Sequence, residues 1–131
     1  MEQASSHRFG VHLISGRLAV VRLDPGTDIP SWSSTGLLSA ILRTPEELTI
    51  VCDQTVVPEA MKSERDWVAL KVEGPLAFTM TGVLATLLEP LAAERISVFV
   101  LSTFDTDYIL VKADESERTV EALRRDGHRM L

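Results

Sequence analysis

The chain has 131 residues, a formal net charge of −6 and 45% hydrophobic residues. This apolar content is ordinary for a folded protein and too high for a disordered one. The length suits one compact domain or two small units that support each other. The acidic balance argues against a general binder of nucleic acid or of anionic membranes, because those partners are themselves negative.

Two further features concern the compartment. No apolar stretch is long enough to span a membrane, and residues 1–17 lack the basic and apolar regions of a signal peptide. The single cysteine, Cys52, has no partner for an internal disulfide. A packed, reduced thiol in a cytoplasmic protein is therefore expected.

The first half of the chain contains three apolar runs that predict strands. Residues 9–13 alternate in character and predict a strand that turns at Ser15-Gly16. Residues 18–23 and 48–52 predict two more strands. A helix is predicted near residues 32–42, between these two strands.

The second half follows a polar link over residues 58–66 and is more regular. Residues 67–72 form a run rich in Val and Leu that predicts a buried strand, and Gly74-Pro75 ends it. Apolar residues then predict a helix over residues 80–91. The remaining elements are a strand, a second strand, a helix and a short final strand, at residues 96–101, 107–112, 114–127 and 130–131.

The two halves share three similar stretches in the same order. They pair residues 17–24 with 66–73, 35–42 with 81–88, and 48–52 with 96–100. The offset stays nearly constant, as expected for two copies of one fold. No second helix is visible in the first copy, so a sheet face is left for the second copy or another subunit to cover. These features predict a first unit at residues 1–60, with an extra N-terminal strand, and a second unit at 61–131.

The text of the second half resembles a known family. The segments EGPLAF (73–78) and TGVLATLLEPLAAERISVFVLSTFDTDYILVK (81–112) resemble the paired ACT-domain family, which includes the CASTOR arginine sensors and is related to the regulatory domains of aspartate kinases. TPEELTIVC (44–52) in the first half is also similar. The resemblance implies an α+β fold of two ferredoxin-like βαββαβ ACT units. Their antiparallel sheets carry helices on one face, and the first unit is incomplete.

The resemblance also implies a function. Relatives bind a small molecule, typically an amino acid, between two ACT units, using the loop after the first strand and the link between the second and third strands. The matching positions here are Glu73, Gly74, Pro75, Leu76, Ser102, Thr103, Phe104, Asp105 and Asp107. The CASTOR sensors carry twice as many ACT units, so this chain would reach that number as a homodimer. The resemblance thus implies a non-enzymatic, amino-acid-sensing regulatory protein.

The residues of these segments suit both ends of an amino acid. The first turn of the helix after Gly74-Pro75 has free N–H groups and a partial positive charge, which suit a carboxylate. Glu73 and Asp107 can accept from an ammonium group, and Asp105 can face a cationic side chain. The alternative is that Gly74-Pro75 simply ends a strand and that residues 105–107 are hydrogen-bonded turn residues.

No other motif indicates a cofactor, a metal or a catalytic residue. His7 and His12 lie five apart, which puts them on opposite faces of a strand. There is no Gly-x-Ser-x-Gly, Gly-x-Gly-x-x-Gly or Walker-type loop. Two alternatives to the sensor stay open. One is a structural module that dimerises or docks on a partner enzyme without a ligand of its own. The other is an enzyme whose catalytic groups are distant in sequence.

Overall fold

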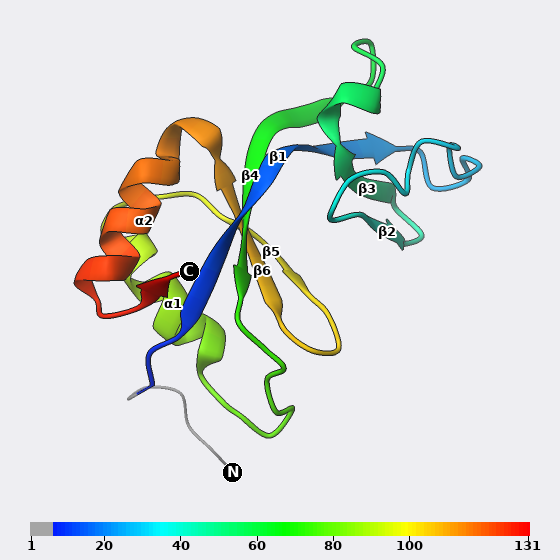
Figure 1. Ribbon diagram of the computed structural model, residues 1–131. Helices are drawn as coiled ribbons and strands as arrows, with labels where there is room; N and C mark the ends of the chain where they lie inside the picture. Colours follow the sequence, from blue (N-terminus) through cyan, green and yellow to red (C-terminus); the bar gives the residue numbers. More distant parts are fainter. Residues whose placement is uncertain (1–6) are drawn as a thin grey trace. The chain divides into compact units, whose positions relative to one another are not determined.

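The computed structural model describes residues 7–131, which divide into two compact units (Figure 1). The larger unit combines the chain up to Ile14 with Val68–Leu131, and the smaller unit comprises Ser15–Trp67. Strands β1 (Gly10–Leu23) and β4 (Ser63–Val72) each contribute to both units. Residues 1–6 of the predicted first unit lie outside the described residues.

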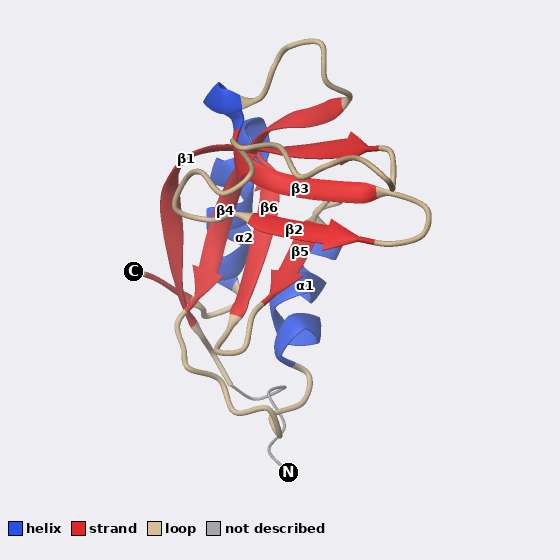
Figure 2. Ribbon diagram, turned by 90° about the vertical axis from the view of Figure 1, so that its right-hand side faces the viewer, coloured by secondary structure: helices blue, strands red, loops and turns tan. Residues whose placement is uncertain are grey.

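The larger unit is a sheet with two helices on one face. Its strand order is β7–β1–β4–β6–β5. Strand β7 (Arg129–Met130) runs parallel to the start of β1, while β5 (Phe99–Ser102) and β6 (Asp107–Lys112) are antiparallel. Helices α1 (Val83–Ala93) and α2 (Ser116–Arg125) cover the same face of these strands (Figure 2). The strand, helix, strand, strand, helix, strand order predicted for the second half is confirmed.

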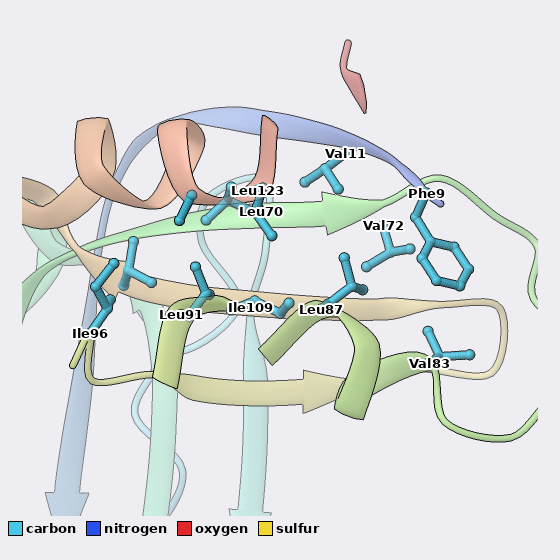
Figure 3. Packing of buried hydrophobic residues seen from close by; sticks show 12 residues of the cluster. Phe9, Val11, Leu70, Val72, Val83, Leu87, Leu91, Ile96, Ile109 and Leu123 are labelled. Atoms are coloured by element: carbon cyan, nitrogen blue, oxygen red, sulfur yellow. The ribbon is translucent and has the colours of Figure 1, made fainter. Parts of the chain in front are cut away.

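An apolar core holds the helices to this sheet. On α1, Val83, Leu87 and Leu91 recur every four residues and are buried, because this spacing places them on one stripe of the helix. They pack with buried residues of α2 and of strands β1, β4 and β6, namely Leu123, Val11, Leu70, Val72 and Ile109 (Figure 3). The start of α1 is thereby fixed relative to the ends of β4 and β6.

The smaller unit is a sheet without an α-helix among its described residues. Its strand order is β2–β3–β1–β4, with β2 (Ala40–Arg43) and β3 (Leu48–Asp53) antiparallel, and β3 and β1 antiparallel as well. A short 3-10 helix, η1 (Gln54–Val56), follows β3. One core cluster of this unit consists of the buried residues Ala19, Val21, Leu48, Ile50, Cys52 and Val57. Burial raises the pKa of the Cys52 thiol, as expected for a packed cysteine.

Two predictions for the first half are wrong. Residues 32–42 form turns and then strand β2, not a helix. The hydroxyls of Ser33 and Thr35 donate to the carbonyls of residues 30 and 32, and Gly36 has a φ of +95°, so local turns replace the helical ladder. The predicted turn at Ser15-Gly16 is also absent. Strand β1 continues through Gly16, whose φ of +94° is a conformation that glycine adopts without steric cost.

A buried histidine ties the start of β1 to the segment before β7. The His128 side chain is fully buried, and its Nδ1 accepts a hydrogen bond from the Phe9 N–H at 3.0 Å. Since Nδ1 is an acceptor, the neutral ring carries its proton on Nε2, which lies 3.5 Å from Asp126 Oδ2. Burial and the positive charge of Arg8 lower the pKa of His128, and they outweigh the opposing Asp126 carboxylate and Thr86 carbonyl.

A proline in α1 removes the usual helical donor of the Thr86 carbonyl, which lies near His128. The helix includes Pro90 and ends three residues later at Ala93. Proline has no N–H, so the carbonyl four residues earlier, that of Thr86, loses its usual helical donor. The nearby Thr86 carbonyl raises the pKa of the His128 ring, against the larger lowering effect of burial.

We predict that the free energy of unfolding decreases as the pH falls below about 6.5. The folded protein keeps His128 neutral, whereas the unfolded chain protonates it near pH 6.5. Protonation therefore favours the unfolded chain below that pH and not above it. Denaturant melts at neutral and mildly acidic pH measure the loss. The variant His12→Gln, at an exposed site, should show the same loss of stability at low pH. An NMR titration of the folded protein that places the His128 pKa at or above 6.5 would contradict the prediction.

Candidate functional site

The two segments that the sequence singles out are in direct contact. The Leu76 N–H, in the loop after β4, donates to the Asp105 carbonyl in the β5–β6 link at 2.6 Å. Thr106 Oγ1 donates to the Val72 carbonyl, also at 2.6 Å. Thr106 is buried, so removing its hydroxyl would leave a buried carbonyl without its donor. These two bonds hold the end of β4 against the link.

Gly74 permits this close approach. A Cβ atom at residue 74 would lie 3.0 Å from the Asp105 carbonyl oxygen and 3.1 Å from Thr106 Cβ. Both distances are tighter than ordinary van der Waals contact, and one neighbour is backbone that has little freedom to move. Any larger residue at this position would push the loop and the link apart.

A cavity of about 420 Å³ lies beside this contact, within the size range of small-molecule sites. The loop after β4, the first turn of α1 and the β5–β6 link form its walls. Its lining residues are Leu76, Ala77, Phe78, Met80, Gly82, Val83, Leu84, Ala85, Ser102, Thr103, Phe104, Asp105, Thr106 and Asp107. Six of the nine predicted site residues line it: Leu76, Ser102, Thr103, Phe104, Asp105 and Asp107.

The other three predicted residues do not line the cavity. The Glu73 carboxylate lies 3.3 Å from the Arg129 guanidinium, and the Glu73 N–H donates to the Gly10 carbonyl. Glu73 thus connects the end of β4 to β1 and β7. Gly74 and Pro75 shape the loop through their backbone.

The N-terminus of α1 opens on the cavity. Its N-cap is Gly82, with a φ of 76°, and no side chain caps the helix. The N–H groups of Val83, Leu84 and Ala85 belong to the first turn, whose amides have no intrahelical acceptor. These residues line the cavity, so an uncapped helix end with a partial positive charge is available to an anion.

Acidic and aromatic side chains occupy the other wall. Asp107 is half-buried, and its Oδ1 accepts from Ser102 Oγ at 2.6 Å, while Asp105 is exposed. The rings of Phe78 and Phe104 meet edge to face with centroids 4.8 Å apart. They are 75% and 79% exposed. A negative group and an aromatic pair therefore border one cavity.

Sequence reasoning missed several of these residues. Thr106 was overlooked because a buried hydroxyl bond to a distant carbonyl leaves no local pattern. The expected first turn of the helix is the TGVLA stretch, but its residues 82–85 are not among the predicted site residues. The glycine just before an apolar helix was the signal that would have identified them.

The described residues contain neither a metal-binding cluster nor a membrane-spanning helix. Among residues 7–131 there is no group of three or more His, Cys, Asp or Glu side chains that could hold a metal ion. No helix in the described part of the chain is long and apolar enough to cross a membrane.

Comparison with known families decides the identity of the larger unit. The model of the ACT domain matches residues 62–125, which include β4, both helices and the whole cavity. Residues 62–125 belong to the ACT domain family. A second family model, described as an N-terminal domain, matches residues 16–60. The resemblance noted in the sequence is thereby confirmed, and the larger unit is called the ACT unit from here on.

Three relatives illustrate the likeness. A protein of known crystal structure from Agrobacterium tumefaciens is 34% identical, with a TM-score of 0.91 over 96% of this chain and 94% of that one. The bovine cytosolic arginine sensor for mTORC1 subunit 1 is 30% identical over 98 residues, covering 66% of this chain. The regulatory subunit of aspartate kinase from Thermus thermophilus is 11% identical with a TM-score of 0.62, over 90% of this chain and 97% of that one, and shares the fold. The chain spans only 30% of the bovine sensor's length.

We predict that Gly74→Ala lowers the free energy of unfolding by about 1–3 kcal/mol, because the new methyl group meets the Asp105 carbonyl. Denaturant melts measure the change. Gly26→Ala is the matched control, since a Cβ there meets nothing within 4 Å. Equal stability of the two variants would show that the loop adjusts freely and that the close contact is not needed.

Proposed function

We propose that this ACT protein is a non-enzymatic regulator that binds an amino acid in the cavity of the ACT unit. The observation that carries the proposal is the convergence of the uncapped N-terminus of α1, the Asp107 carboxylate and an apolar wall on one cavity of suitable size. An α-amino acid presents the three complementary groups: a carboxylate, an ammonium and a side chain.

The carboxylate is assigned to the first turn of α1. The N–H groups of residues 83–85 lack intrahelical acceptors, and the helix dipole favours negative charge at this end. No side chain competes for this position, because the N-cap residue is Gly82. A carboxylate bound here would take the place of the missing cap.

The ammonium is assigned to Asp107. One of its oxygens is held by Ser102 Oγ, which orients the carboxylate. The other oxygen remains available as an acceptor for a charged donor, a strong type of hydrogen bond. Glu73, Gly74 and Pro75 support the site from outside the cavity, by fixing the loop rather than by touching the ligand.

The relatives support the regulatory part of the proposal. By name, one is a cytosolic arginine sensor and another is the regulatory subunit of a kinase. We further propose that this chain forms a cytoplasmic homodimer that regulates a partner enzyme. In such a dimer a second ACT unit would cover the exposed Phe78 and Phe104 and enclose the ligand between ACT units. We also propose that the first of the two ACT-like units ends near residue 60, as the sequence predicts.

The smaller unit favours a second candidate, a docking module without a ligand of its own. Strand β2 is an edge strand of this unit, and Leu37 and Leu42, before and within it, are 76% and 65% exposed. Open strand edges and exposed apolar side chains are typical of surfaces that pair with another chain.

A thermal-melt panel with the twenty common amino acids tests the proposal. A ligand at about 100 times its dissociation constant should stabilise the protein by about 2.7 kcal/mol, which raises the melting temperature by several degrees. Asp107→Asn should weaken that ligand by roughly 10- to 100-fold, since a charged hydrogen bond is lost. The control Asp28→Asn removes an exposed charge outside the cavity and should leave affinity unchanged. No shift with any amino acid would favour the docking module.

A further inference from the structure

The lining of the cavity limits which amino acids can bind there. This inference rests on the proposed function. We infer that the ligand carries an apolar side chain, aliphatic or aromatic, rather than a cationic one. Three features of the cavity support this: the apolar side chains in its lining, the aromatic pair at its border, and the placement of its acidic groups.

Several side chains that line the cavity are apolar. Leu76, Met80 and Leu84 are half-buried and line the cavity, and each also packs on the core of the ACT unit. Their remaining exposed surface therefore sits on a fixed support. An apolar ligand side chain would remove this surface from water, whereas a polar one would have to give up hydration there.

Phe78 and Phe104 extend this apolar wall. The two rings come from different segments, the loop after β4 and the β5–β6 link, and the hydrogen bond from Leu76 to Asp105 holds those segments together. Rings this large are usually buried, yet these are mostly exposed. An aliphatic or aromatic side chain placed against them would be covered on that side. A guanidinium could also stack on such rings, so the rings alone do not distinguish an apolar from a cationic ligand side chain. The charged groups of the cavity make that distinction.

The acidic groups do not favour a cation. Once Asp107 pairs with the ammonium, Asp105 is the other acid in the lining, and it is exposed. An ion pair with an exposed carboxylate gains little, because water screens it. The carbonyl of Asp105, by contrast, accepts the hydrogen bond from Leu76 that holds the loop. The structure therefore offers a cationic side chain no buried partner.

Isosteric ligand pairs test the inference by calorimetry on the full chain. Norleucine and lysine differ by the terminal ammonium, and citrulline and arginine differ by the charge. We expect norleucine, leucine, methionine or phenylalanine to bind at least about 10-fold more tightly than lysine or arginine. Lysine or arginine binding as tightly as its neutral partner would overturn the inference.

Two variants separate this inference from the proposed function. Asp105→Asn should clearly weaken a cationic ligand, and an equally clear loss for the preferred ligand would show that it pairs with this acid and would contradict the inference. Phe104→Ala, at a position that is 79% exposed, should weaken an apolar ligand by about 5- to 10-fold. If arginine binds, depends on Asp105 and is lost in Asp107→Asn, the side-chain inference fails and amino-acid binding stands. If no amino acid binds at all, both fail.

Discussion

The contact between the loop after β4 and the β5–β6 link is the constraint on which the site depends. Two backbone carbonyls, those of Asp105 and Val72, accept the bonds that close it. Gly74 makes the approach possible, because no Cβ stands between the two segments. As a result the aromatic pair meets, and the first turn of α1 opens on the same cavity as the start of β6. A cavity built this way is fixed mainly by backbone, which leaves side chains available for a ligand.

The link STFDTD shows how one short segment serves both structure and site. Thr103 and Thr106 close the turn with each other, and Thr106 also bonds to β4. Asp105 contributes its carbonyl to the fold, while its side chain is exposed to the cavity. Asp107 shares a hydrogen bond with Ser102 across the strand ends. Residues 105–107 can therefore serve both as turn residues and as binding-site residues, because different atoms fill the two roles.

The second half of the chain was predictable because its local signals agree with its packing. The apolar stripe of α1, the Val-rich strand before Gly74 and the two strands around the link all point to one fold. In the first half the predicted helix near residues 32–42 is wrong, because turns closed by hydroxyl groups and the conformation of Gly36 compete with a helix there. Within the site, the partner of Glu73 was not predictable, because Arg129 is far away in sequence and near only in the fold.

The two copies of the repeat diverge where the site lies. The stretch that matches the start of α1 forms turns and β2 in the smaller unit, so no helix N-terminus is available to a carboxylate there. The acid after β3, Asp53, accepts from the N–H and hydroxyl of Thr55, and these bonds hold the pKa of Asp53 below its usual range. Its carboxylate thus caps η1 instead of lining a cavity. Among the described residues, only the ACT unit combines a free helix end with an acid beside it, so the ligand proposal belongs to that unit alone.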